Sequence, residues 1–302
     1  MTAPAVAGRL LDEPALLAKA GTENFPVAMR LLPRSRREEL LAIYGFARLV
    51  DDLGDELPGG PQARLAALER AEAELDRAFA GAATDPVFVR LTPVIERRSL
   101  ERRPFADLLA ANRLDQEKAC CETYEELLEY CRLSANPVGR LVLALAGLAG
   151  EQAAARLSDD VCTGLQIVEH LQDVAEDAAR GRVYLPAEDM RAFGVEPGDL
   201  AGETRAGRGA AGRGAASPAL RRLVAFETGR ARELLASAGE LAARLPGLWR
   251  LVVAGYGGGG LAQAEALELA GYDVCSAPAA LKASKARVAR CTARVLLRKG
   301  RC

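Results

Sequence analysis

The sequence predicts an all-α protein. Half of its 302 residues are hydrophobic, whereas only 5% are aromatic, and Ala, Leu, Arg and Glu recur throughout, which favours helix over strand. Apolar residues recur at helical spacing, and no region alternates strands with helices. The length allows one large domain or two ordinary ones, with a large buried core in either case.

The first predicted helix covers residues 33–50, after a proline start and with apolar residues at helical spacing. The segment PGGP at 58–61 then breaks the chain. The residues on the apolar face of this helix are Leu40, Ile43, Tyr44 and Ala47.

Six more helices are predicted before residue 181, and Ser158 is predicted to cap the last of them because Asp159 and Asp160 follow it. These helices cover residues 62–80, 85–98, 104–121, 124–133, 137–148 and 158–180.

The C-terminal third begins with residues 201–217, a Gly- and Arg-rich segment without periodicity that predicts a surface loop or flap. Two last helices are expected at 218–244 and 248–271. We divide the chain into a helical domain over residues 1–279 and a basic tail over residues 280–302.

The tail contains eight Lys or Arg and no acid, whereas the rest of the chain contains 32 basic and 41 acidic residues. Two interpretations stay open. The tail is either a solvated end without fixed structure, or a weak contact with anionic lipid through a partial apolar stripe. The residues of that stripe are Val288, Val295, Leu296 and Leu297.

The overall charge and the cysteines exclude several classes of protein. The formal net charge is -1, which indicates no nucleic-acid partner. Seven cysteines without a Cys-x-x-Cys pair, and a single histidine, argue against zinc and against a disulfide framework. The N-terminus lacks a signal-peptide pattern, and no stretch approaches the ~20 apolar residues of a membrane span. We expect a cytoplasmic protein.

Two of the predicted helices carry acidic stripes, from DDLGDE at 51–56 and QDVAED at 172–177. If the stripes faced each other, their carboxylates would repel unless cations lay between them. Mg²⁺ prefers oxygen ligands and takes one or two carboxylates together with phosphate oxygens, so a diphosphate fits the open positions. The alternative is two solvated helix ends paired with arginines. The first stripe holds Tyr44, Arg48, Asp51 and Asp55, and the second holds Gln166, Glu169, Asp173 and Asp177.

Three motifs carry a resemblance to a known family. YGFARLVDDLGDE (44–56) and LQIVEHLQDVAEDAARGRVYLP (165–186) resemble the two aspartate-rich motifs of the squalene and phytoene synthase family. EYCRLSANPVGRLVL (129–143) resembles its intermediate Tyr-Cys motif. NFPVAMRLLP (24–33) and SANPVG (134–139) are most similar to the bacterial hopanoid-pathway branch, which converts presqualene diphosphate to hydroxysqualene.

The resemblance implies a single-domain isoprenoid-synthase helical bundle with a central cavity, and it implies roles for individual residues. Asp51, Asp55, Asp173 and Asp177 would hold Mg²⁺ and the diphosphate. The other implied positions are Arg48 and Arg182 near the diphosphate, Tyr44, Tyr130 and Tyr184 around the cavity, and Phe25, Val138, Gly139 and Gln166 along the prenyl tunnel. Two positions depart from the family pattern: Glu169 stands where Asn is usual, and Gln172 where many members have Arg.

The expected activity is Mg²⁺-dependent ionisation of a prenyl diphosphate, followed by carbocation rearrangement and capture of water, without NADPH. One alternative is head-to-head condensation of two prenyl diphosphates to presqualene diphosphate, squalene or phytoene. Another is a non-catalytic helical assembly factor. The expected partners are the prenyl diphosphate, the lipid that the tail would contact at the inner membrane face, and other hopanoid-pathway enzymes through functional coupling.

Two further features have competing interpretations. Gly255, Gly257 and Gly260 form a Gly-x-Gly-x-x-Gly sequence, but the expected fold lacks the βαβ unit that a dinucleotide site requires, so we interpret these glycines as thinning a helix near Tyr256. His170 is more typical of a packed helix residue than of a catalytic base.

Overall fold

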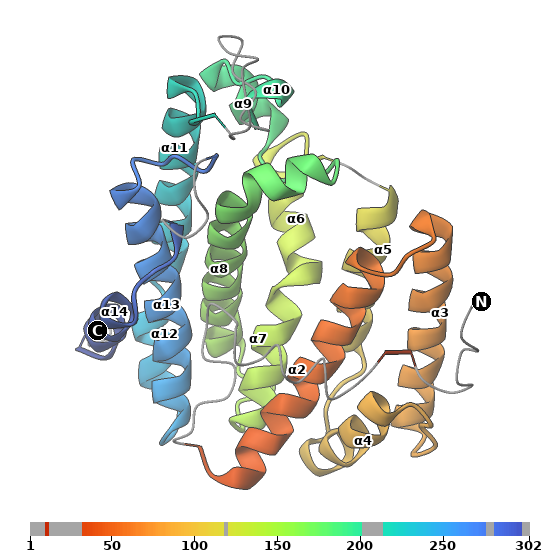
Figure 1. Cartoon of the computed structure of the whole chain (residues 1–302). Helices are drawn as coiled ribbons and strands as arrows, with labels where there is room; N and C mark the ends of the chain where they lie inside the picture. Colours follow the sequence, from red (N-terminus) through yellow and green to blue (C-terminus); the bar gives the residue numbers. More distant parts are fainter. Residues whose placement is uncertain (1–9, 12–31, 118–119, 201–213, 276–280, 298–302) are drawn as a thin grey trace. The chain divides into compact units, whose positions relative to one another are not determined.

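The chain is all-α, as a computed structural model shows for residues 10–11, 32–117, 120–200, 214–275 and 281–297 (Figure 1). Within those ranges the β-type pairing is limited to an isolated bridge between Cys120 and Val183. The chain forms two compact units. Unit 1 comprises Met1–Glu117 and Pro137–Gly150, and unit 2 comprises Lys118–Asn136 and Glu151–Cys302.

Unit 1 packs its helices around an aromatic core. The Phe46 ring makes edge contacts with Phe88 and Phe105, at centroid distances of 5.7 and 5.0 Å. All three rings are fully buried, so they join three different helices through large apolar contacts. The helices of unit 1 are α2 (Arg34–Asp55), α3 (Gly60–Phe79), α4 (Pro86–Arg98), α5 (Arg103–Glu117) and nearly all of α7 (Asn136–Leu145).

Helix α2 is longer than its sequence pattern predicts. It continues through the acidic stretch to Asp55, so the carboxylates lie on regular helix rather than in a loop. Its buried Glu39 accepts hydrogen bonds from Arg98 of α4 at 2.9 to 3.1 Å. This buried charge is therefore paired, as burial requires.

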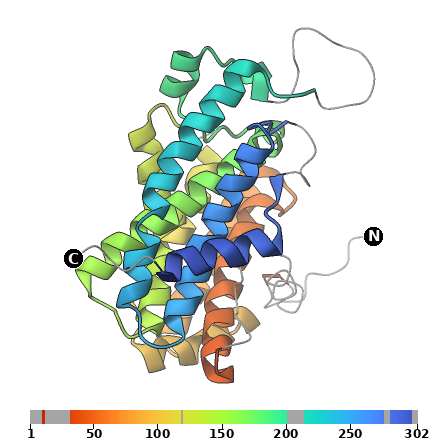
Figure 2. The same cartoon turned by 90° about the vertical axis from the view of Figure 1, so that its left-hand side faces the viewer.

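Unit 2 is arranged around α8, a helix of 28 residues that packs against α6, α11, α12 and α13 (Figure 1). Its other helices are shorter, and α14 lies across α13 (Figure 2). The helices of unit 2 are α6 (Tyr124–Ser134), α8 (Gln152–Ala179), α9 (Ala187–Phe193), α10 (Pro197–Leu200), α11 (Pro218–Leu235), α12 (Ala238–Arg244), α13 (Trp249–Leu269) and α14 (Lys285–Leu297).

Two predicted helix boundaries in unit 2 are wrong. Ser158 does not cap α8, because the helix already begins at Gln152 and Ser158 is buried inside it. The Ala-rich segment QAAARL is a strong helix former, and it extends the helix toward the N-terminus. The helix predicted at 218–244 is divided at Ala236, where Ser237 donates a hydrogen bond to Asp160 Oδ2 at 2.8 Å.

The glycines of α13 allow close helix packing, as the sequence predicts. A Cβ atom on Gly257 would lie 2.3 Å from Ala238 Cβ of α12, and one on Gly258 would lie 2.5 Å from backbone atoms of Thr292 in α14. Both glycines lie inside a continuous helix. A dinucleotide-binding loop is therefore absent from this segment.

The basic tail is more ordered than a solvated end. Residues 285–297 form α14, which packs on α13 and buries Cys291 and Val295. Most of the predicted flap, residues 201–213, lies outside the described residues. No helix among the residues that the structure describes is long and apolar enough to cross a membrane.

Candidate functional site

The first half of the candidate site is the acidic face of α2 in unit 1. Asp51 is exposed and Asp55 is half-buried, one helical turn further on. Tyr44 and Arg48, which the sequence places on the same face, are also half-buried. The helix therefore presents two neighbouring carboxylates at its C-terminal end.

Arg48 is held by acidic residues of its own helix. Its Nε atom lies 2.7 Å from Asp52 Oδ1, and its Nη2 atom lies 3.3 Å from Glu56 Oε1. Asp52 is buried, whereas Glu56 is exposed. These ion pairs hold the guanidinium beside the acidic face of α2.

Asn112 of α5 orients Asp51, a contact that the sequence does not predict. Its side-chain amide donates to Asp51 Oδ1 at 3.2 Å, and Gln116 donates to the Gly54 carbonyl at 3.0 Å. A Cβ atom on Gly54 would lie 2.2 Å from Asn112 Oδ1. Glycine at position 54 therefore provides the space for the amide that orients the carboxylate.

The charge state of Asp51 depends on these neighbours. The protein atoms packed around it raise the pKa of Asp51 to about 7; the hydrogen bond from Asn112 opposes this rise and the Asp55 carboxylate adds to it. Water still reaches the exposed carboxylate, which moderates the rise. A cation bound here would favour the ionised form and lower the pKa.

The second half of the candidate site is the acidic face of α8 in unit 2. Asp173 is exposed at its surface, whereas Asp177 and Glu169 are half-buried. Burial of part of the side chain and the charge of Glu176 both raise the pKa of Asp173. Asp177 also accepts, through its main-chain carbonyl, a hydrogen bond of 2.9 Å from the Arg182 backbone. This bond ties Arg182 to the end of the acidic face.

His170 belongs to the α8 face, although its sequence context is more typical of a packed helix residue. Its Nε2 lies 3.2 Å from Gln166 Nε2, and its Nδ1 lies 4.0 Å from Asp177 Oδ2. In this orientation the Gln166 amide donates to Nε2, so the imidazole proton is on Nδ1. Burial lowers the pKa of His170 to about 3, which keeps the ring neutral at physiological pH.

Two tyrosines extend this face into an aromatic wall. Tyr184 stacks on His170 with a centroid distance of 3.8 Å, and its hydroxyl lies 3.5 Å from that of Tyr130. The Cys121 amide donates to the Val183 carbonyl at 3.4 Å, which holds the segment of Tyr184 beside the start of α6. The predicted site residues Tyr130, Gln166 and Tyr184 thus lie together within unit 2.

Four further residues that the sequence analysis named are Val138, Gly139, Phe25 and Gln172. Val138 and Gly139 lie on α7 in unit 1, half-buried and buried respectively. Phe25 lies outside the described residues. Gln172 is directed toward the C-terminal segment, where its amide donates to the Leu281 carbonyl at 2.9 Å. Gln172 thus holds the segment that leads into α14.

Each acidic face fits Mg²⁺ only in part. Two carboxylates one turn apart match the number that proteins usually give to Mg²⁺, and a bound cation would offset the burial that raises the pKa of Asp51. Within the described residues, no three His, Cys, Asp or Glu side chains gather into a ready-made metal site. Oxygen atoms from a substrate phosphate and water would have to complete the coordination.

Comparison with known proteins places the chain in one family. The family model for squalene/phytoene synthase matches residues 18–291. Hydroxysqualene synthases from Sinorhizobium fredii and Rhodopseudomonas palustris are each 38% identical to the chain over 59% of its length, and phytoene synthase from Mycobacterium tuberculosis is 32% identical over 59%. These matches span 60%, 60% and 58% of the relatives' own lengths.

Solved structures agree with this assignment. Squalene synthase HpnC from Alicyclobacillus acidocaldarius is 40% identical, with a TM-score of 0.74 over 85% of this chain and 92% of that chain. A ligand-bound dehydrosqualene synthase is 25% identical, with a TM-score of 0.78 over 94% of both chains. The helical isoprenoid-synthase fold predicted from the motifs is confirmed, and the chain belongs to the squalene/phytoene synthase family.

Proposed function

We propose that this enzyme converts presqualene diphosphate to hydroxysqualene in a Mg²⁺-dependent reaction. The observation that carries the proposal is the pair of Asp-x-x-x-Asp faces, one on α2 and one on α8, in a family member 38% identical to two hydroxysqualene synthases. Asp51, Asp55, Asp173 and Asp177 would hold the metal. When bound, Mg²⁺ neutralises the charge that develops on the leaving diphosphate.

The protein's own residues would then position the substrate and stabilise the negative charge of the departing diphosphate. The carbon–oxygen bond breaks, the diphosphate leaves with the electron pair, and a carbocation remains. Arg48 and Arg182 would add positive charge near the departing group, where stabilisation raises the rate. Arg48 is already oriented by Asp52 at 2.7 Å.

The aromatic wall on unit 2 suits the cationic stage. The faces of Tyr130 and Tyr184 are electron-rich and attract a cation, and the neutral His170 that stacks on Tyr184 adds no opposing positive charge. A single water molecule that adds to the rearranged cation and loses a proton gives an alcohol. No electrons are gained, so the reaction would need no NADPH.

Head-to-head condensation of prenyl diphosphates is the second candidate, because the phytoene synthase from Mycobacterium tuberculosis is also 32% identical to the chain. Glu169 favours the first candidate, since it adds a carboxylate to the α8 face at a position where the family usually carries Asn. A non-catalytic assembly role would leave the aspartate pairs without a purpose.

We further propose a cytoplasmic enzyme that works at the inner membrane face and is coupled to other hopanoid-pathway enzymes, because substrate and product are lipids.

The experiment is an incubation of purified protein with Mg²⁺ and without NADPH, given either presqualene diphosphate or farnesyl diphosphate, with products identified by mass spectrometry. Hydroxysqualene from presqualene diphosphate alone is the expected result. Presqualene diphosphate formed from farnesyl diphosphate would favour the condensation, and absence of released inorganic diphosphate from both would contradict any enzymatic role. Asp51→Asn and Asp177→Asn should each abolish the release while the helical circular dichroism signal is kept.

A further inference from the structure

The surface formed by α14 carries a large excess of positive charge. Residues 281–297 contain five cations and no acid. Three arginines of α14, Arg287, Arg290 and Arg294, contact one carboxylate of α13, Glu265, at N–O distances of 3.8, 2.5 and 3.1 Å. One negative charge cannot neutralise three positive charges, so an excess of positive charge remains at the surface.

Two of these arginines are available to a partner outside the protein. The side chains of Arg290 and Arg294 are 54% and 63% exposed despite their contact with Glu265. Lys285, at the start of the helix, is also exposed. The sequence adds Arg298, Lys299 and Arg301 directly after α14.

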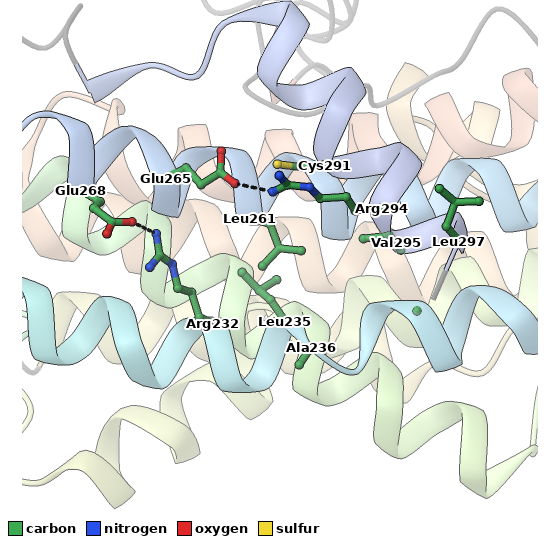
Figure 3. Close-up of a pocket in the computed structure, with 11 residues that line it drawn as sticks. Arg232, Leu235, Ala236, Leu261, Glu265, Glu268, Cys291, Arg294, Val295 and Leu297 are labelled. Carbon is green, nitrogen blue, oxygen red and sulfur yellow. Dashed lines mark hydrogen bonds and ion pairs between the residues drawn. The ribbon is translucent and has the colours of Figure 1, made fainter. Parts of the chain in front are cut away.

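An apolar pocket of about 470 Å³ opens beside these charges, between α11, α12, α13 and α14 (Figure 3). Leu235, Leu261 and Val295 supply apolar walls, and Leu235 and Leu261 point toward one another. The rim is charged: Arg294 pairs with Glu265, and Arg232 pairs with Glu268 at 2.5 Å. All these residues belong to unit 2.

Leu297 extends the apolar surface beyond the pocket. It lines the pocket and is nevertheless 80% exposed. Next to it, the Arg250 side chain donates to the Leu296 carbonyl at 3.0 Å, which places another cation at the end of α14. Exposed leucine beside cations is typical of protein surfaces that meet the headgroup region of a bilayer, where both groups are satisfied.

We infer that α14 and the adjoining pocket form a docking surface for anionic phospholipid, with the arginines on the phosphate groups and Leu297 in the acyl boundary. A soluble acidic protein would match the charge but would not require the exposed leucine beside an apolar pocket. Each basic residue near an anionic membrane strengthens binding by about fivefold. The inference does not depend on the proposed reaction, because none of these residues belongs to the acidic faces.

The test is flotation of the purified full chain with vesicles of phosphatidylcholine, with and without phosphatidylglycerol, and with no isoprenoid present. The chain should bind the anionic vesicles, and binding should fall as salt rises because salt screens exposed charges. The double variant Arg290→Ala/Arg294→Ala should bind roughly 25-fold more weakly. Leu297→Ser should weaken binding while leaving its dependence on salt unchanged.

Matched controls separate the surface from net charge and from misfolding. Arg34→Ala/Arg103→Ala removes the same amount of charge from two exposed arginines of unit 1, which pair with Glu38 and Asp107, and this variant should bind like wild type. Lys285→Gln, at an exposed position, should weaken binding about fivefold without affecting the fold. Equal binding to neutral vesicles, an equal loss in the unit 1 control, or no binding to anionic vesicles would overturn the inference. A dimer that Leu297→Ser dissociates, without vesicle binding, would instead identify a second copy of the chain as the partner.

Discussion

Asn112 and His170 complete the two acidic faces, and neither follows from the acidic motifs. Asn112 lies on α5, 61 residues from the Asp51 that it orients. His170 lies on the same helix as Gln166 and Asp177, at i+4 and i−7, so helical spacing alone could have placed it on the face. The signal for Asn112 is weaker: it and Gln116 lie one turn apart on a helix that carries several other polar and charged residues, so the sequence does not single them out.

We predict that Asn112→Ala weakens Mg²⁺-dependent diphosphate binding by roughly 10- to 100-fold, because a hydrogen bond to a charged group contributes about 1.5–3 kcal/mol. The measurement is isothermal titration calorimetry with inorganic diphosphate and Mg²⁺. Gln116→Ala is the control, since Gln116 bonds to the Gly54 carbonyl and not to a carboxylate. Equal losses in both variants would mean that Asn112 only stabilises the helix pair.

The second residue-scale prediction concerns Glu227, which is buried beside Arg230 and Asp189 in unit 2. Arg230 Nη1 lies 2.9 Å from Glu227 Oε1 and 2.6 Å from Asp189 Oδ2. Burial raises the pKa of Glu227 from 4.5 to about 8, and Arg230 opposes the rise while Asp189 adds to it. The folded state therefore keeps a proton that the unfolded chain has lost, and stability falls as pH rises toward and through 8.

Ionisation of Glu227 should therefore lower the free energy of unfolding of wild type by about 1.4 kcal/mol between pH 7 and pH 9. Glu227→Gln mimics the protonated form and should not show this loss. Urea unfolding at the two pH values measures the difference. Glu233→Gln removes an exposed carboxylate from the same helix and should keep the wild-type slope. A slope unchanged by Glu227→Gln would show that Glu227 is ionised at pH 7.

At the scale of elements, most helices could be predicted because proline, glycine and apolar periodicity mark them. The wrong boundaries arose where a local signal competed with a stronger one. Ser158 is a good cap residue, but the preceding Ala-rich segment favours helix more strongly. The division at Ala236 has no proline, and the nearby Gly239 lies inside the next helix; the division is accompanied by the long-range hydrogen bond from Ser237 to Asp160.

The contact between α13 and α14 gives the third prediction. Gly258→Ala places a methyl group against the Thr292 backbone, which cannot move aside as a flexible side chain would. The variant should lose about 1–3 kcal/mol in thermal or urea unfolding. Gly229→Ala on α11 meets nothing within 4 Å and should gain about 0.5–1 kcal/mol. A neutral Gly258→Ala would mean that α14 is only loosely attached.

At the scale of the whole molecule, the sequence predicts which residues form each acidic face. In the structure, each unit carries its predicted aspartates one turn apart on one helix, α2 or α8. The meeting of the two faces depends on an arrangement between α2 and α8 that no local pattern encodes. The family motifs supply that expectation, and the confirmed family and fold support it. Sharing of one diphosphate by both faces stays a prediction.

The most direct measurement is Mg²⁺-dependent binding of inorganic diphosphate to wild type, Asp51→Asn, Asp177→Asn and the double variant, by isothermal titration calorimetry. If both faces hold one diphosphate through shared Mg²⁺, each single variant should lose nearly all binding and the double variant should lose little more, because the two positions act as one unit. Wild-type affinity in either single variant, or losses that simply add, would contradict a shared site.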